Sequence, residues 1–407
     1  MASTCRFPNV SKQTRKAVAV REKAKPTATA FESVALLLQG GGALGAYQAG
    51  VYEALLDAKV EPTWIAGISI GAINSAIIAG NPRETRCARL REFWELVSQP
   101  HDGGWSSYWS DMLSGDAARS WVNQLSAGEI MAKGVPGFFR PRVPPPFLMP
   151  AGLAGATSWY DTSALKPTLE RLVDFDRINS KTMRFSVGAV NVRTGNFAYF
   201  DNETDVIRPE HVMASGALPP AFDAVEIDGE FYWDGGMVSN TPLDWVLSAR
   251  SDLDTLIFQV DLWSAQGVLP RDLSEVAVRM KEVQFSSRTR AATDGFKRIQ
   301  RLRAAFNELL AQMPPELAAT PQARLLAEAS DPAVYNIVQL VYRSATYEGQ
   351  SKDYEFSRRT MEEHWAAGRR DALLTLSHPE VLARPTGAHS VQTFDFTTPS
   401  ASPQKDQ

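Results

Sequence analysis

The chain has 407 residues, of which 44% are hydrophobic and 22% are charged, and its formal net charge is −4. This composition is typical of a globular protein with one large or two modest domains, and the small negative charge excludes a global basic field that would attract nucleic acid. Two cysteines, Cys5 and Cys87, are too few for a disulfide framework or a metal cluster, which indicates a reducing compartment. No apolar run reaches the ~18 residues of a membrane span. We therefore expect a cytoplasmic protein that meets any lipid in solution or peripherally at a membrane.

The N-terminal residues, 1–32, differ in composition from the rest of the chain. Before residue 30 a single acid, Glu22, is surrounded by cations without apolar periodicity, namely Arg6, Lys12, Arg15, Lys16, Arg21, Lys23 and Lys25. Such a segment is typical of a disordered basic arm. The alternatives are a contact with anionic lipid headgroups and a transit peptide for an organelle.

A repeated strand–helix pattern marks the beginning of the folded part. The apolar runs at 34–38 and 63–68 are typical of buried parallel strands. Apolar residues at helical spacing follow each run, from 44 to 58 and from 70 to 77. Strand, helix, strand and helix in this order predict right-handed parallel crossovers, and therefore an α/β fold with a mainly parallel central sheet.

Residues 99–160 break this pattern. They contain the proline-rich run Pro144 to Pro150 and many aromatic residues, among them Trp105, Trp109, Trp121, Phe138 and Phe139. Proline at this density excludes a central strand or a long helix. We expect either a surface insertion packed by its own aromatic side chains or a lid that faces lipid, because amphipathic aromatic residues suit a boundary between apolar phase and water.

Strand signals return at 185–190, 196–200, 225–233 and 255–262. Asp228-Gly229, within the third of these segments, is a favoured two-residue hairpin turn. Helical patterns dominate from 271 to 313 and from 354 to 376, with one strand expected near 335–342. We therefore divide the chain into a basic arm at 1–32, a main α/β domain at 33–263, a mostly helical C-terminal extension at 264–385 and a flexible tail at 386–407.

The first segment with chemical potential is Gly67-Ile68-Ser69-Ile70-Gly71, between a predicted strand and a predicted helix. In a nucleophile elbow a sharp turn of this kind pushes a serine hydroxyl out of the sheet, and flanking glycines avoid clashes within the turn. The motif alone is weak, since a glycine-rich turn is the ordinary alternative. Its strand–turn–helix context favours a nucleophilic Ser69.

The second segment is Gly40-Gly41-Gly42-Ala43-Leu44-Gly45, also between a strand and a helix. Successive backbone N–H groups at a helix N-terminus bind negative charge, so this loop is a candidate oxyanion hole. The same letters match a dinucleotide-binding fingerprint, but that interpretation requires an acidic residue at the end of the next strand. Here that strand ends in Gly67-Ile68-Ser69, and Glu61 precedes it.

The third segment is Asp234-Gly235-Gly236, which follows the strand ending at Trp233. An Asp-Gly pair is often only a loop that caps its own turn. In company with the other two segments, Asp234 becomes the candidate general base. A carboxylate is a weak base unless burial raises its pKa, so we predict that Asp234 is shielded from water.

A histidine for a Ser-His-Asp triad must follow the acid in chain order in an α/β-hydrolase. Of the five histidines, His101 and His211 do not satisfy this order, whereas His364, His378 and His389 do. None of the three follows a glycine-flanked strand end. We expect them to be packed or exposed to solvent rather than catalytic.

Together these blocks resemble the patatin-like phospholipases. The resemblance covers residues 34–263 and also includes Ala214 to Pro220 and Asn240-Thr241-Pro242, which match the segments that flank the family's Asp-Gly-Gly motif. The segment from Lys352 to Arg358 looks like part of a C-terminal extension found on some bacterial patatin-like proteins.

The resemblance implies a three-layer α/β/α fold and a lipid acyl hydrolase of the phospholipase A type that forms an acyl-enzyme. It implies a histidine-free dyad of Ser69 and Asp234, and an oxyanion hole made by the N–H groups of Gly41, Gly42 and Ala43. It implies neither a metal nor a cofactor.

Leu44 is a departure from the family pattern, because many relatives carry Arg or Lys there. The loss of that charge argues against a preference for anionic phospholipid headgroups. A Ser-His-Asp esterase or polyester depolymerase, a nucleotide-binding oxidoreductase and a non-catalytic lipid-binding protein stay open as alternatives.

Overall fold

The computed structural model describes residues 29–99, 116–153, 155–249, 253–286, 289–330, 333–344, 348–385 and 391–397. Most of the expected basic arm lies outside these ranges. So do Cys5, His101, Trp105, Trp109 and His389.

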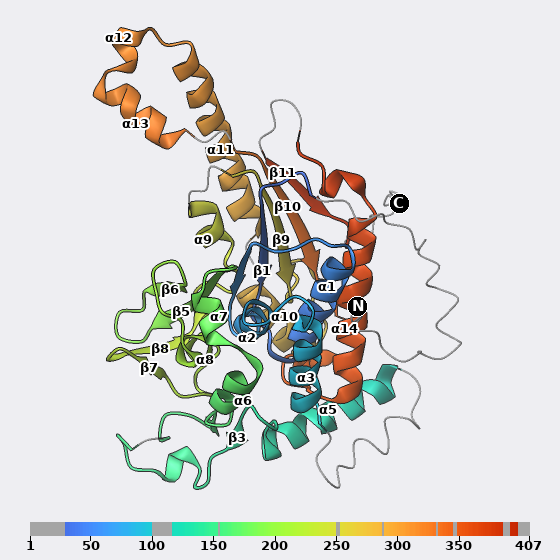
Figure 1. The fold of residues 1–407 in the computed structure, drawn as a ribbon. Helices are drawn as coiled ribbons and strands as arrows, with labels where there is room; N and C mark the ends of the chain where they lie inside the picture. Colours follow the sequence, from blue (N-terminus) through green and yellow to red (C-terminus); the bar gives the residue numbers. More distant parts are fainter. Residues whose placement is uncertain are drawn as a thin grey trace.

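A nine-stranded mixed sheet is the centre of the described part (Figure 1). Its order is β11-β10-β9-β1-β2-β5-β8-β7, with β6 paired to β5. The strands are β1 Ser33–Leu38, β2 Trp64–Gly67, β5 Arg184–Asn191, β6 Phe197–Asp201, β7 Val225–Ile227, β8 Glu230–Asp234, β9 Thr255–Asp261, β10 Tyr335–Val341 and β11 Val391–Asp395. Pairing is parallel from β11 to β5 and antiparallel among β5, β6, β7 and β8. The predicted mainly parallel sheet is therefore confirmed.

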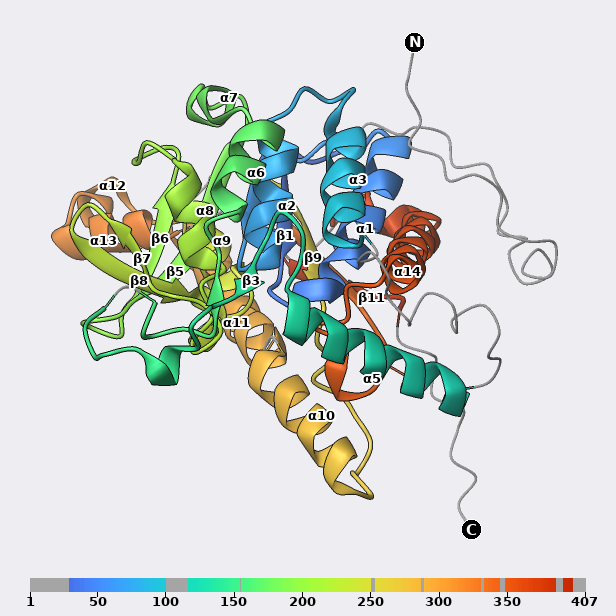
Figure 2. The same cartoon turned by 90° about the horizontal axis from the view of Figure 1, so that it is seen from below.

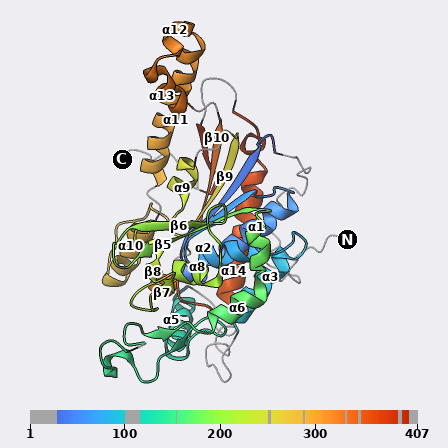
Figure 3. The same cartoon turned by 60° about the vertical axis from the view of Figure 1, so that its left-hand side comes forward.

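Helices cover both faces of this sheet, as Figures 1, 2 and 3 show. Leu36, Leu38 and Phe258 belong to the larger core cluster, which they share with α1 Ala46–Asp57, α2 Ile70–Ala79, α3 Arg86–Val97 and α14 Arg358–Leu376. Leu37 and Ile257 point to the other face, where they pack with α9 Leu243–Ser248 and α11 Thr289–Ala311. The alternation of side chains along a strand produces these two cores. The predicted three-layer α/β/α fold is confirmed.

Smaller elements complete the fold. The other helices are α5 Asp116–Lys133, α6 Leu165–Leu172, α7 Phe175–Asn179, α8 Pro209–Ser215, α10 Leu273–Phe285, α12 Pro315–Ala318 and α13 Pro321–Ala329. β3 Arg140–Pro141 and β4 Tyr160–Asp161 form a separate antiparallel pair. Short 3-10 helices lie at Gly42–Gly45, Pro146–Leu148, Gly235–Met237, Gly349–Ser351 and Pro379–Val381. At the predicted hairpin turn, Asp228 and Gly229 both have positive φ, 52° and 84°, as a two-residue turn requires.

The expectation of no long helix in the insertion is wrong for its first part. α5 runs for 18 residues before the proline-rich run begins, and it buries Val122, Ala127 and Ile130 on one side. The prolines restrict only the segment that contains them. After α5 the insertion consists of short elements, as expected.

The C-terminal extension is built into the main domain rather than attached to it. β10 pairs with β9 over seven residues, and Trp365 of α14 is fully buried in the larger core. The expected flexible tail at 386–407 is wrong for Val391–Asp395, which form edge strand β11 beside β10. Parallel hydrogen bonds to β10 order this segment, although its polar sequence carries no strand signal.

One part of the extension leaves the body of the molecule. α11 runs beyond the sheet and carries α12 and α13 on a projecting arm (Figure 1). Apolar side chains remain exposed on this arm, namely Leu302, Leu309, Leu317 and Leu325.

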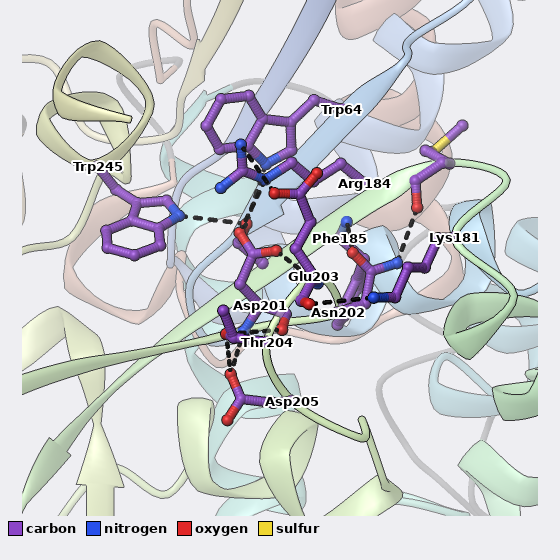
Figure 4. A network of polar contacts seen from close by, with 12 residues as sticks. Trp64, Lys181, Arg184, Phe185, Asp201, Asn202, Glu203, Thr204, Asp205 and Trp245 are labelled. Atoms are coloured by element: carbon purple, nitrogen blue, oxygen red, sulfur yellow. Dashed lines mark hydrogen bonds and ion pairs between the residues drawn. The ribbon is translucent and has the colours of Figure 1, made fainter. Parts of the chain in front are cut away.

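A polar network locks the antiparallel end of the sheet to its parallel part (Figure 4). Asp201 is buried and accepts hydrogen bonds from Arg184 Nε at 2.9 Å and from Ser186 Oγ at 2.7 Å. Ser186 Oγ in turn accepts from Trp64 Nε1 at 2.9 Å and from Trp245 Nε1 at 3.2 Å. The network therefore joins β2, β5, β6 and α9 through satisfied buried groups.

Among the described residues, every helix is too short or too polar to cross a bilayer.

Candidate active site

The sheet register brings the three predicted segments to one edge. Leu38 of β1 pairs with Gly67 of β2, so the glycines after Leu38 and Ser69 after Gly67 leave the sheet side by side. β5 lies next to β2, and its Ala189 pairs with Asp234 at the end of antiparallel β8. Parallel and antiparallel pairing thus place the hydroxyl, the carboxyl and the glycine loop around one point.

Ser69 occupies a strained turn between β2 and α2. Its φ of 55° and ψ of −122° are rarely adopted by residues other than glycine. Its N–H donates to Ser215 Oγ at 3.0 Å, and that hydroxyl donates to the Gly188 carbonyl at 2.7 Å. A Cβ added to Gly67 would lie 2.3 Å from the Gly71 carbonyl oxygen, so the turn requires that glycine. This is the backbone of a nucleophile elbow.

Asp234 is 2% exposed at the carboxyl end of β8. Its Oδ1 accepts from the Gly236 N–H at 2.7 Å, and its own N–H donates to the Ala217 carbonyl at 3.0 Å. Burial raises the pKa of Asp234 to about 7, although hydrogen bonds from the Ser69 side chain and the Gly236 N–H act to lower it. The predicted shielding of Asp234 is confirmed, and a carboxyl with this pKa exchanges protons near neutrality.

The glycine-rich segment turns from β1 into the 3-10 helix Gly42–Gly45. The Ala43 N–H donates to the Asp353 carbonyl at 2.8 Å, so the prediction that Ala43 belongs to the oxyanion hole is wrong for this arrangement. Within the described ranges, the N–H groups of Gly41 and Gly42 have no protein acceptor, and both residues line a cavity. Gly42 has φ 56°, and a Cβ there would lie 2.0 Å from the Asp353 carbonyl oxygen.

Close packing explains most of the other motif glycines. An added Cβ would meet Asn240 Oδ1 at 2.4 Å from Gly40, Ile70 Cγ1 at 2.6 Å from Gly45, the Leu38 carbonyl oxygen at 2.2 Å from Gly71, the Gly188 carbonyl oxygen at 2.6 Å from Gly235 and Asn240 Oδ1 at 2.8 Å from Gly236. Side chains at these positions would push the three segments apart.

Several residues that hold the glycine loop carried no signal in the sequence. Gln39 Oε1 accepts from the Leu262 N–H at 2.6 Å and the Trp263 N–H at 3.0 Å, which ties β1 to the end of β9. The Gly40 carbonyl accepts from Trp263 Nε1 and from Asn240 Nδ2, both at 3.0 Å. Only Asn240 lay in a recognisable block, and its role needs contacts across 200 residues of chain.

An apolar cavity of about 340 Å³ opens from these groups. Ser69, Asp234 and the glycine loop line one part of it. The other walls come mostly from the insertion and the C-terminal extension, with Phe222 added by the main domain. The lining residues from the insertion and the extension include Ile130, Phe138, Phe139, Tyr160, Phe285, Tyr354 and Phe356. The aromatic residues of the insertion therefore do not only pack on each other. A cavity that is polar near the hydroxyl and apolar beyond it suits an ester with a hydrocarbon chain.

The described histidines lie elsewhere. His364 is buried behind the glycine loop, with its Nδ1 at 3.4 Å from the Ala43 carbonyl oxygen, and does not line the cavity. His378 stacks on Phe396, and His211 accepts from the Arg208 N–H at the start of α8. This placement agrees with packed histidines. His389 and His101 lie outside the described residues.

No group of three or more histidine, cysteine, aspartate or glutamate side chains is placed to hold a metal ion in the part of the chain that the structure describes.

Comparison with protein families identifies the chain. The family model described as patatin-like phospholipase matches residues 36–247, more than half of the chain. A second model, described as patatin phospholipase, matches residues 283–388. The chain belongs to the patatin-like phospholipase family, and the protein is a lipid ester hydrolase. A search of curated proteins found no match.

Solved structures give only distant overlaps. VipD from Legionella pneumophila is 14% identical over 90% of this chain and 73% of its own, with a TM-score of 0.37. The type III effector ExoU is 16% identical over 87% of this chain and 54% of its own, with a TM-score of 0.29. ExoU in complex with SpcU from Pseudomonas aeruginosa is 16% identical over 73% and 68%, with a TM-score of 0.28. Scores this low add nothing to the assignment.

Proposed function

We propose that the protein cleaves lipid acyl esters with a Ser69–Asp234 dyad through an acyl-enzyme intermediate. The observation that carries the proposal is that the buried Asp234 carboxyl and Ser69, at a nucleophile elbow, line one cavity, where burial raises the pKa of Asp234 to about 7. Among the described residues that line the cavity no histidine separates the carboxyl from the hydroxyl, and a buried carboxyl with a raised pKa is basic enough to deprotonate Ser69 as it attacks.

In the first half of the reaction, Asp234 accepts the hydroxyl proton as Ser69 Oγ attacks the ester carbonyl carbon. The N–H groups of Gly41 and Gly42 bind the negative oxygen of the tetrahedral intermediate. The intermediate collapses when the carbon–oxygen bond to the alcohol breaks, and Asp234 returns its proton to the leaving alkoxide. The acyl group remains on Ser69 as an ester.

In the second half, Asp234 accepts a proton from water, and the hydroxide attacks the acyl carbonyl carbon. The same glycine N–H groups hold the second oxyanion. Collapse breaks the bond to Ser69 Oγ, which regains the proton from Asp234, and a fatty acid leaves. Both halves use one base, and the reaction consumes only water and ester.

The apolar walls of the cavity support a hydrocarbon acyl chain as the group bound next to Ser69. A cytoplasmic protein that contacts its lipid at a membrane surface is consistent with this chemistry and remains a prediction.

Two measurements test the proposal. We expect a fluorophosphonate probe to label wild-type protein and not Ser69→Ala, and the same variant to release no fatty acid from lipid vesicles. We expect kcat/KM to fall about tenfold per pH unit below about pH 7, since protonated Asp234 cannot accept the serine proton.

The alternatives predict other outcomes. A Ser-His-Asp esterase would lose activity on replacement of His364, His378 or His389 with Gln, whereas the dyad retains turnover once a variant is folded. A lipid-binding protein without catalysis would bind vesicles and leave the probe unreacted. A profile flat down to about pH 5 would contradict a base with this pKa.

A further inference from the structure

The C-terminal extension contacts both backbone polar groups of Ala43 in the glycine loop. The N–H of Ala43 donates to the Asp353 carbonyl at 2.8 Å, and the carbonyl oxygen of Ala43 lies 3.4 Å from His364 Nδ1. Asp353 belongs to residues 348–357, which we call the C-terminal loop, and His364 to α14. The Ala43 N–H belongs to the peptide group that joins Ala43 to Gly42, so the bond to Asp353 also holds the carbonyl end of Gly42.

Two crossed ion pairs fasten the C-terminal loop to α10. Lys281 Nζ lies 2.8 Å from Asp353 Oδ1, and Lys352 Nζ lies 2.8 Å from Glu282 Oε1. On each segment a lysine directly precedes an acid, and each lysine pairs with the acid of the other segment. Lys352 is only 3% exposed, so this pair is shielded from the screening that weakens surface pairs.

The same lysines also contact aromatic residues of the cavity. Lys281 Nζ is 5.0 Å from the centroid of the Tyr354 ring, and Lys352 Nζ is 5.0 Å from that of Trp263. Both rings line the cavity, and Trp263 also donates to the Gly40 carbonyl. The ion pairs therefore reach the glycine loop by two routes, through the Asp353 carbonyl and through Trp263.

The far end of the C-terminal loop is anchored to the insertion. Glu355 is 1% exposed and accepts from Ser126 Oγ of α5 at 2.6 Å and from the Ser357 N–H at 3.1 Å. Phe356 follows and lines the cavity. The loop is held at both ends, with the contact to Ala43 between them.

We propose that the C-terminal loop is a positioning element of the catalytic site, which sets the glycine N–H groups for the oxyanion through Asp353 and the two crossed ion pairs. This inference rests on the proposed function. It assigns a role in catalysis to the region that the second family model matches, residues 283–388, which contains none of the proposed reacting groups.

The loop acts on the transition state rather than on substrate binding. Hydrogen bonds to an oxyanion form fully only when charge develops on the carbonyl oxygen, so a displaced N–H group lowers kcat more than it raises KM. A role limited to stability would lower the melting temperature and leave kcat per intact site unchanged.

The test is a double-mutant cycle on Lys281 and Asp353. Lys281→Gln and Asp353→Asn keep size and the Asp353 backbone carbonyl while they remove the ion pair. We expect each to lower kcat by about tenfold with KM within about twofold, and the double variant to lie no lower than either single one. The charge-swapped variant, Lys281→Asp with Asp353→Lys, should regain part of the loss.

A matched control lies at the start of the same helix, where Arg271 pairs with Glu275 at 2.7 Å and is largely exposed. Arg271→Gln should leave kcat unchanged. All rates are expressed per site titrated with a fluorophosphonate, at a temperature well below each melting transition.

Wild-type kcat in both single variants would overturn the positioning role, as would strictly additive losses or a change in KM alone. The failure of the proposed function looks different, because Ser69→Ala would then retain turnover. If Ser69→Ala is inactive and the ion-pair variants are normal, only the positioning role is lost.

Discussion

The two glycine-rich turns of the site, after β1 and after β2, are held in different ways. The turn after β2 is tight within itself, because Gly67 packs against the backbone of Gly71, and it has few contacts beyond: Gly71 packs against the backbone of Leu38, and Ser215 Oγ accepts from the Ser69 N–H. The turn after β1 is held by groups far along the chain, including Asn240, Asp353 and others. The turn of the nucleophile therefore depends on fewer remote contacts than the oxyanion loop does.

The largest effect is expected at Asp234, whose carboxyl lines the cavity together with both turns. Asp234→Asn removes the base and keeps an acceptor for the Gly236 N–H, so kcat should fall by at least about 10³-fold. Release of fatty acid under single-turnover conditions measures the loss. A variant within tenfold of wild type would show that some other group accepts the serine proton.

The same substitution should stabilise the protein at neutral and higher pH. The pKa of Asp234 is about 7 in the folded protein and 3.8 for an unperturbed aspartate, so its contribution to stability is fully present below pH 3.8 and is lost as the pH rises through 7. Asn does not ionise and avoids this loss, a gain on the order of 4 kcal/mol at about pH 8. Urea unfolding at about pH 8 and pH 5 measures the difference, which should shrink at the lower pH.

Gly42→Ala tests the remotely held turn. Its φ of 56° and the Asp353 carbonyl oxygen 2.0 Å from the new Cβ combine strain with a clash, so we expect kcat to fall about 100-fold and stability by about 1–3 kcal/mol. Gly195→Ala is the matched control, since its φ is 70° and nothing lies within 4 Å of an added Cβ. The control should lose stability alone.

Asn240→Ala removes two hydrogen bonds, to the carbonyls of Gly40 and Phe285. We expect a loss of about 10- to 30-fold in kcat, smaller than for Gly42→Ala because Trp263 still holds Gly40. Asn179→Ala also removes two hydrogen bonds, one donated to the Ile207 carbonyl and one accepted from the Ile207 N–H, at a position that does not line the cavity, and it should lower only the melting temperature. Equal kcat in the two variants would mean that the loop is less dependent on remote contacts than the structure suggests.

The smallest effect concerns chain length. Phe356→Ala enlarges the apolar end of the cavity, so kcat/KM should shift by about three- to tenfold toward longer acyl chains, with little change in kcat for short esters. A series of p-nitrophenyl esters measures this shift. Phe147→Ala, at an exposed position outside the cavity, should leave the preference unchanged.

The same contrast explains what the sequence could predict. The order of strands and helices, and the position of Ser69 and Asp234 at strand ends beside one cavity, could be predicted because each depends on short patterns of apolar residues and glycines. The sequence could not show that the Ala43 N–H is already occupied, because its acceptor is the carbonyl of Asp353, 310 residues away in the chain. β11 was missed because an edge strand paired on one side needs no apolar run, and α5 because prolines that follow a helix do not forbid it.

The place of β10 in the sheet has a consequence for biosynthesis. β9 is paired on one side by β1 and on the other by β10, yet 73 residues separate the end of β9 at Asp261 from the start of β10 at Tyr335. In a growing chain one edge of the apolar strand β9 therefore stays unpaired until β10 has left the ribosome. Nascent molecules stalled before that point should be caught by chaperones or aggregate, even though every residue of the proposed dyad has already been made.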